Sequence, residues 1–250
     1  MRKFLRAVIA GVSVICVLAL TGTWLGWLYP LPSPSAIATP TIRLYAGSEE
    51  IAILNGTSHR SQVWVPMAQI PRHVVDAVLV TEDKRFFLHH GIDFLAVMRA
   101  TWSDLWHHGI RQGASTITQQ LARTLFLSNK RTWQRKVHEA IIAVALESRY
   151  SKERILEAYL NTVYMGEDGG VAVHGMGAAS RHFLHKELSS VRLDEAALLA
   201  ATISAPNRFL SSGHAERVRS ARDSVLQAMR DRGIVTEVAA RRAEAQPPIW

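Results

Sequence analysis

Residues 132–163 decide the fold, and they read TWQRKVHEAIIAVALESRYSKERILEAYLNTV. Apolar side chains recur there every three or four positions, which is the spacing of one face of an α-helix. In the first half the repeat consists of Trp133, Val137, Ala140, Ile141, Val144 and Ala145. In the second half it consists of Ile155, Leu156, Tyr159, Leu160 and Val163. Ser151 is a suitable N-cap between them, so we expect two consecutive helices, over 132–149 and 152–163.

The helical spacing extends outward from this stretch, from Pro71 to near the C-terminus. It predicts further helices over residues 73–88, 94–107, 116–127, 174–183, 194–203, 214–231 and 236–245. Upstream, residues 41–45 and 51–54 are β-prone on either side of Gly47 and predict a small hairpin or extended arm. The fold class is therefore mainly α, with a linker and short extended arm over 30–70 and one globular domain over 71–250.

The N-terminus carries a long apolar run. From Ala7 to Tyr29 no side chain is charged, and a helix of that length would span about 34 Å, enough for a hydrocarbon core of about 30 Å. Basic residues precede the run, which places the N-terminus in the cytoplasm. We expect residues 1–29 to be a cytoplasmic tip and a transmembrane helix. The alternative is a cleaved signal peptide, because residues 36–38, Ala-Ile-Ala, resemble a cleavage site.

The net charge of +8 indicates an anionic partner: nucleic acid, anionic lipid or a phosphorylated substrate. Most of the excess lies in residues 111–154, which contain nine Lys/Arg and three acidic residues and so carry a net charge of +6. Any anion is therefore expected to bind this segment. The only cysteine, Cys16, excludes an intramolecular disulfide and a zinc site built from cysteines.

Two motifs lie on either side of the predicted 94–107 helix. Residues 82–93, EDKRFFLHHGID, read locally as a helix end with Gly91 as C-cap, and functionally as a carboxylate held by a rigid turn. Residues 113–120, GASTITQQ, contain a capping box of Thr116 and Gln119. A glycine-led helix N-terminus of this kind is also suited to bind an anion.

Two more motifs lie within the quoted stretch. In residues 135–139, RKVHE, Glu139 falls nearly opposite the apolar repeat and one turn after Arg135. The local interpretation is an exposed Arg–Glu pair that contributes about a few tenths of a kcal/mol. Residues 152–161, KERILEAYLN, are read mostly as helix architecture.

Together, in this order and spacing, the four motifs resemble glycosyltransferase family 51, which is found in class A penicillin-binding proteins and monofunctional peptidoglycan transglycosylases. The family patterns E-D-x-x-F-x-x-H-x-G, G-x-S-T-x-x-Q-Q, R-K-x-x-E and K-x-x-I-L-x-x-Y-L-N all stand here. The resemblance covers residues 42–229 and implies a lysozyme-like, two-lobed glycosyltransferase domain. One departure is Ala221, where the family's last motif has the first of two arginines.

The resemblance implies polymerisation of lipid II into β-1,4 glycan strands with inversion and release of undecaprenyl diphosphate. Glu82 matches the general base, and Glu139 matches a second essential acid. The matching cations are Arg123, Arg131, Arg135 and Lys136. The polar residues expected to bind substrate are Ser115, Thr116, Gln119 and Gln120. The residues expected to brace the turn that carries Glu82 are Asp83, Phe86 and His89.

The resemblance also implies surroundings and partners. It implies lipid II, an undecaprenyl-diphosphate-linked glycan and the membrane as partners, with no nucleic acid. The implied location is the cytoplasmic (inner) membrane in a single pass, with the catalytic domain on its outer, periplasmic face. No metal ligand is identified; no cofactor is required, and a divalent metal, Mg²⁺ or Mn²⁺, is left open. Residues 94–106 are either a membrane-dipping part of the domain or ordinary core.

The sequence contains no Ser-x-x-Lys and no Lys-Thr-Gly, which a penicillin-reactive transpeptidase needs. We therefore expect no transpeptidase activity and cooperation with a separate transpeptidase. Two alternatives stay open: a lysozyme-like lytic transglycosylase, which has no need of a basic segment, and a catalytically silent scaffold for cell-wall assembly.

Overall fold

The computed structural model describes residues 28–32, 42–46, 49–54, 60–99, 115–127, 132–206 and 215–247. These residues are mainly helical, as predicted. The chain divides into two compact units, one of Met1–Leu31 with Arg85–Tyr159 and one of Pro32–Lys84 with Leu160–Trp250. In the stretches just given, no helix is long and apolar enough to cross a membrane. The expected transmembrane helix lies outside them, apart from its last two residues.

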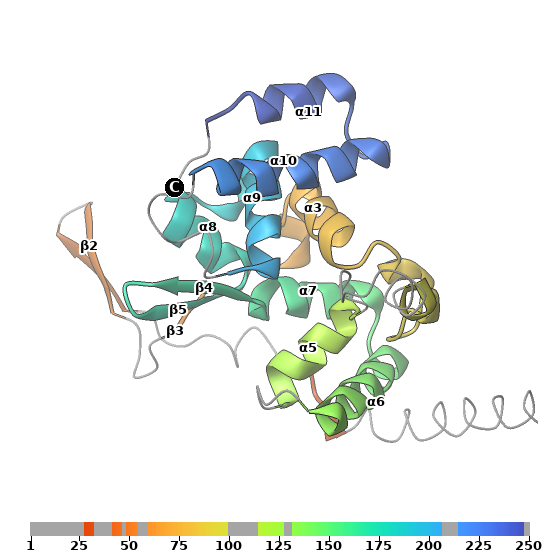
Figure 1. Ribbon diagram of the computed structural model, residues 1–250. Helices are drawn as coiled ribbons and strands as arrows, with labels where there is room; N and C mark the ends of the chain where they lie inside the picture. Colours follow the sequence, from red (N-terminus) through yellow and green to blue (C-terminus); the bar gives the residue numbers. More distant parts are fainter. Residues whose placement is uncertain are drawn as a thin grey trace, which may run out of the picture. The chain divides into compact units, whose positions relative to one another are not determined.

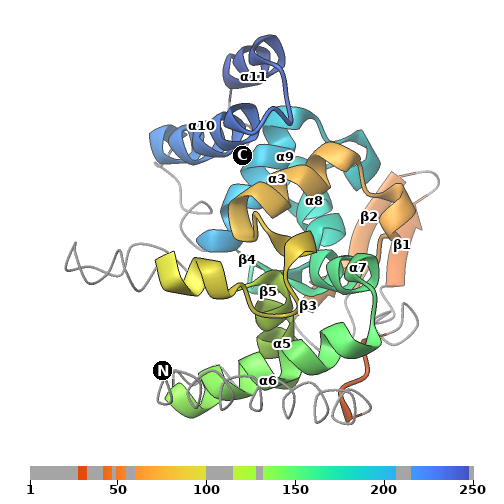
Figure 2. The ribbon, with the colours of Figure 1, turned by 90° about the vertical axis from the view of Figure 1, so that its right-hand side faces the viewer.

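The first unit is built on α5 (Ile117–Phe126), α6 (Trp133–Arg149) and most of α7 (Lys152–Thr162). Helices α5 and α6 pack side by side, as Figures 1 and 2 show. The capping box predicted at the start of α5 is confirmed, because Thr116 and Gln119 each bond the other's backbone N–H. The unit's fully buried apolar side chains include Ile117, Leu121, Ile142, Leu146, Ile155 and Leu156.

The predicted apolar face of α6 is wrong, because of its six residues only Ala145 is buried. Trp133 and Val137 are 87% and 57% exposed, whereas Glu139 is only 2% exposed. The buried residues are Glu139, Ile142, Ala143, Ala145 and Leu146. A count of apolar spacing treats every carboxylate as a surface group, and here ionic partners compensate for the burial of Glu139.

The first of the predicted helices needs new boundaries. The helix expected over 73–88 is α3 (Arg72–Glu82), and it ends at Asp83, whose backbone leaves the helical region; a separate 3₁₀ turn follows at Phe86–Leu88. The chain passes from the second unit to the first after Lys84. Phe86 is 1% exposed in the core of the first unit, so α3 must end before it. Residues 94–99 are helical, as predicted for the start of the 94–107 helix; the remainder lies outside the described residues.

The second unit is built around α3, α9 (Leu193–Ser204) and α10 (Ala215–Asp231), which contact one another. Both ribbon views show this packing, with α11 (Glu237–Glu244) beside α10. Arg222 of α10 is 1% exposed and donates to the carbonyl oxygens of Glu244 and Gln246. This arginine therefore holds the end of α11 in place.

A small sheet in the second unit was not predicted. It consists of β3 (Arg60–Gln62), β5 (Val171–His174) and β4 (Tyr164–Asp168), in that order, with β3 parallel and β4 antiparallel to β5. Helix α8 (Met176–Leu184) packs against the sheet. The hairpin expected upstream is confirmed as β1 (Ile42–Ala46) and β2 (Glu49–Leu54). Short 3₁₀ turns lie at Met67–Gln69 and Leu188–Ser190.

Hydrogen bonds from polar side chains hold the short strand β3 and the segment that follows it. His182 of α8 bonds Ser61 through Nε2 at 2.9 Å and Asp168 through Nδ1 at 3.2 Å. The Asn161 amide bonds both the N–H and the carbonyl of Val65, at 2.7 and 2.9 Å. Asn161, the last residue of the fourth motif, thus fixes the segment that leads into α3, which confirms the architectural interpretation for this position.

Candidate active site

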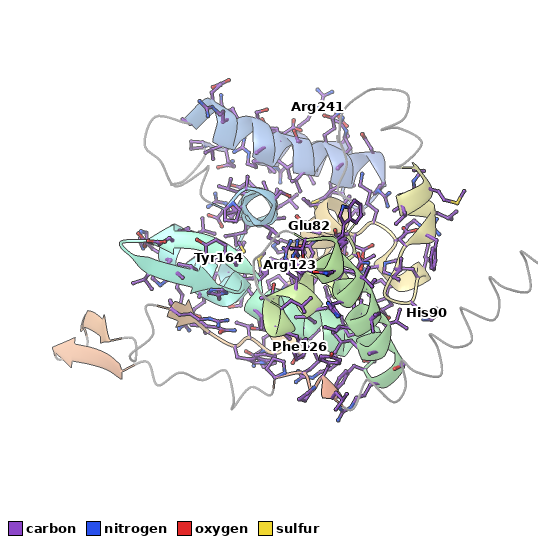
Figure 3. The ribbon with its side chains drawn as sticks, turned by 60° about the horizontal axis from the view of Figure 1, so that its bottom comes forward. Glu82, His90, Arg123, Phe126, Tyr164 and Arg241 are labelled. Atoms are coloured by element: carbon purple, nitrogen blue, oxygen red, sulfur yellow. The ribbon has the colours of Figure 1, made fainter. Side chains whose placement is uncertain are left out.

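Glu82 is the last residue of α3 and lies half-buried in the second unit. Its Oε1 accepts a hydrogen bond of 2.8 Å from the hydroxyl of Ser204, the last residue of α9. Asp83 follows as C-cap, is buried, and donates its backbone N–H to Leu79. The carboxylate of Glu82 is therefore supported by two helices that end at the same place; Figure 3 labels it.

Two residues predicted to brace this turn lie in the first unit. Phe86 and His89 are both buried, and their rings meet edge to face with centroids 6.2 Å apart. The ammonium group of Lys152 lies 4.3 Å from the centre of the Phe86 ring, a cation–π contact. Burial suits a supporting role, and that role stays a prediction.

Glu139 is the centre of a charged cluster in the first unit. Its Oε1 accepts a hydrogen bond from Arg135, and its Oε2 accepts one of 2.9 Å from Lys136. Lys136 also donates to the Ser115 hydroxyl at 2.6 Å. The Glu139 side chain is 3% exposed, against 16% for Arg135 and 41% for Lys136. The sequence-based interpretation of an exposed Arg–Glu pair is therefore wrong.

The physical reason for this correction is the environment of the pair. A buried ion pair is costly to break, by about 3–5 kcal/mol, because one charge is then left without a partner in a poorly solvated place. One carboxylate here faces two cations, so the cluster keeps a positive excess. Arg123 of α5, which Figure 3 labels, is exposed and adds to it. The arrangement can stabilise an anion that brings two or more negative charges.

The surroundings of the cluster change the pKa of Lys136. Burial lowers the pKa of its ammonium group, and the positive charges of Arg123 and Arg135 lower it further. Its ordinary value is 10.5. A lowered pKa means that the ammonium loses its proton at a lower pH than an ordinary lysine. A bound anion reverses this effect, because it favours the charged form.

We therefore expect anion binding to weaken at alkaline pH. Affinity for inorganic diphosphate should fall as pH rises from neutral toward the ordinary lysine pKa, and it should fall more than in a Lys136→Arg variant, whose guanidinium stays charged. Competition binding at several pH values measures this. Identical pH dependence in wild type and Lys136→Arg would contradict it.

The predicted substrate-binding polar residues also have structural partners. Thr116 is buried and donates its hydroxyl to the Gly91 carbonyl at 2.6 Å, besides capping α5. Gly91 has φ of +84°, and a Cβ there would lie 2.9 Å from the backbone of Ala143, so only glycine fits. Gln120 accepts a hydrogen bond of 3.0 Å from the Tyr159 hydroxyl. Substrate contacts by these residues stay a prediction.

Two features were missed by sequence reasoning. Lys152 donates to Glu147 at 2.7 Å, and Thr118 donates to the same Oε1 at 2.6 Å. The side chains of Glu147 and Lys152 are 4% and 15% exposed, so this is a second largely buried ionic contact of the first unit. In the sequence, the lysine that begins the fourth motif could have indicated this contact. The contact of Ser204 with Glu82 had no such signal, because a serine before Ala-Pro is typical of any helix end.

Arg131 lies outside the described residues. Within the described ranges, no group of three or more His, Cys, Asp or Glu side chains is placed to hold a metal ion.

The chain is similar in sequence to a known protein family. The family model described as Transglycosylase matches residues 48–230. Penicillin-binding protein 1B of Vibrio cholerae is 42% identical over 197 residues, which cover 79% of this chain and 25% of that protein. Penicillin-binding protein 1F of Bacillus subtilis is 40% identical over 182 residues, covering 73% and 25%. The chain thus spans about a quarter of the length of these curated relatives.

A crystal structure of penicillin-binding protein 1A from Haemophilus influenzae is similar at a lower level. Its TM-score is 0.47 and its identity 19%, over 79% of this chain and 19% of that chain. The family assignment rests on the sequence matches.

Proposed function

This chain belongs to the transglycosylase family, and on that premise we propose that it is a peptidoglycan glycosyltransferase that polymerises lipid II. The observation that supports this most directly is the buried Glu139, which holds both Arg135 and Lys136, while Lys136 also contacts Ser115. A fixed pair of cations suits a diphosphate leaving group, whose developing negative charge must be stabilised in the transition state.

The proposed reaction joins two lipid-linked sugars. The 4-hydroxyl of the acceptor GlcNAc attacks the anomeric carbon of the donor MurNAc, and the bond from that carbon to the diphosphate breaks. Glu82 accepts the hydroxyl proton as the new bond forms, because a neutral sugar hydroxyl is a poor nucleophile. Attack opposite the α-linked diphosphate inverts the centre and yields a β-1,4 bond. Undecaprenyl diphosphate leaves, its charge balanced by the Arg135–Lys136 pair and Arg123.

We also propose that the first unit contacts the membrane. Six large apolar side chains are exposed between positions 87 and 98: Phe87, Leu88, Phe94, Leu95, Val97 and Met98. Soluble surfaces seldom expose so many apolar groups along one short stretch. This supports the membrane-dipping interpretation over ordinary core. With an N-terminal anchor, the domain would lie on the outer face of the cytoplasmic membrane, where lipid II is polymerised.

A lytic transglycosylase is the main alternative, since it also uses a glutamate in a helical domain. It cleaves a finished glycan and releases no diphosphate, so it has no need of the Arg135–Lys136 pair. We also propose that the strands made by this chain are cross-linked by a transpeptidase site outside these 250 residues, which contain no Ser-x-x-Lys motif.

Purified protein incubated with labelled lipid II, with and without Mg²⁺ or Mn²⁺, tests the proposal. We expect a ladder of lengthening glycan on a gel and loss of that ladder with moenomycin. A fluorescent penicillin added to the same samples should label no band. Cleavage of preformed glycan without growth from lipid II would support the lytic alternative, and neither activity would support the silent scaffold.

A further inference from the structure

Ser204 contacts the proposed general base from a helix 122 residues away in sequence. Its hydroxyl donates to Glu82 Oε1 at 2.8 Å. Both residues belong to the second unit and both end a helix, α3 for Glu82 and α9 for Ser204. The contact therefore depends on how these two helices pack.

That packing is firm. The α9 residues from Asp194 to Ile203 are all buried, and Ser204 is the first exposed residue at its end. The α3 residues Val74, Ala77 and Val78 are completely buried, and α3 and α9 contact each other. The backbone of Ser204 is therefore held in place by the helix that it ends. Its hydroxyl can help to orient the half-buried carboxylate of Glu82.

The electrostatics of the site make the donor useful. A helix C-terminus carries partial negative charge on its last carbonyls, and here α3 and α9 end together. This field opposes the ionised carboxylate that a general base requires. A hydrogen bond donated to the ionised form favours that form.

We propose that Ser204 is a positioning residue for Glu82: it orients the carboxylate and favours its ionised form. The inference rests on the proposed function, because it assigns Ser204 a role in the same proton transfer. It predicts an effect on turnover rather than on substrate binding, since Ser204 acts through Glu82.

The test compares Ser204→Ala with Ser204→Thr, which keeps a hydroxyl. We expect Ser204→Ala to lower kcat about tenfold and leave KM for lipid II unchanged. Ser204→Thr should recover most of the rate. Ser224→Ala is a matched control, because Ser224 is also an exposed helical serine and bonds its own helix at Ser220.

A second measurement does not depend on activity. In protein with ¹³C-labelled glutamate side chains, the Glu82 carboxyl signal, assigned by its loss in Glu82→Gln, should change its chemical shift in Ser204→Ala, because a hydrogen-bond donor is removed, and return toward the wild-type position in Ser204→Thr. A wild-type rate in Ser204→Ala, or an unchanged Glu82 carboxyl signal, would overturn the role of Ser204 and leave the proposed function intact. A wild-type protein that makes no glycan would overturn the proposed function, and the role of Ser204 in that reaction with it.

Discussion

Glu82→Gln should abolish most glycan synthesis while lipid II still binds. Glutamine keeps the shape of the side chain and can still accept the hydrogen bond from Ser204, but it cannot take up the proton of the acceptor hydroxyl. Loss of a general base typically costs about 100- to 10,000-fold in rate. The loss should fall on kcat, because an interaction made only in the transition state is removed. Polymerisation rate and lipid II affinity measured on the same samples test this.

A carboxylate elsewhere on a helix provides the control. Glu237 begins α11, is exposed, and pairs with Arg241 four residues later. Glu237→Gln should therefore polymerise at the wild-type rate. If Glu82→Gln keeps more than about a tenth of the rate, the loss is smaller than general base catalysis requires, and the base has been misassigned.

Glu139→Gln should also disable turnover, but for a different reason. The change leaves Arg135 and Lys136 without the carboxylate that both of them contact in a largely buried place. The two cations then repel each other and lose their fixed positions. We expect polymerisation to fall roughly 100-fold or more, as for loss of a preorganised electrostatic group, together with weaker moenomycin binding. Glu82→Gln should leave moenomycin binding unchanged, which separates the two glutamates.

Arg135→Gln should resemble Glu139→Gln, because each change breaks the same contact. The matched controls are Glu237→Gln and Arg241→Gln, which break the exposed pair four residues apart on α11; Arg241 is labelled in Figure 3. These controls should leave rate and moenomycin affinity unchanged. Thermal unfolding shows whether the α6 variants stay folded. Full activity in a folded Glu139→Gln would return this residue to the role of a structural ion-pair partner.

Local patterns predicted much of the second half of the chain. Helices α6, α7, α9 and α10 have clear helical spacing, and their observed ends lie within one residue of those predicted. The capping box at the start of α5 was also predictable, since Thr116 and Gln119 satisfy each other's backbone within four residues. Helical spacing and capping involve residues within a few positions of one another, so the sequence alone predicted these features.

Contacts between residues far apart in the sequence could not be predicted in this way. Strand β3 has three residues and pairs with β5 across more than 100 positions, so no repeat could identify it. The burial of Glu139 in place of Trp133 depends on which side of α6 the rest of its unit covers. The donation from Ser204 to Glu82 exists because α3 and α9 end together.

The sequence by itself therefore determined the helical fold class, the four motifs and the residue types that an anion-stabilising, base-assisted reaction needs. These follow from spacing, capping and charge, which are properties of neighbouring residues. Only the tertiary structure decided which charges are buried, which cations share one carboxylate and which hydroxyl supports Glu82. The physical reason is that burial and desolvation depend on the packing of whole helices, and they decide whether an ion pair is a weak surface contact or a fixed electrostatic centre.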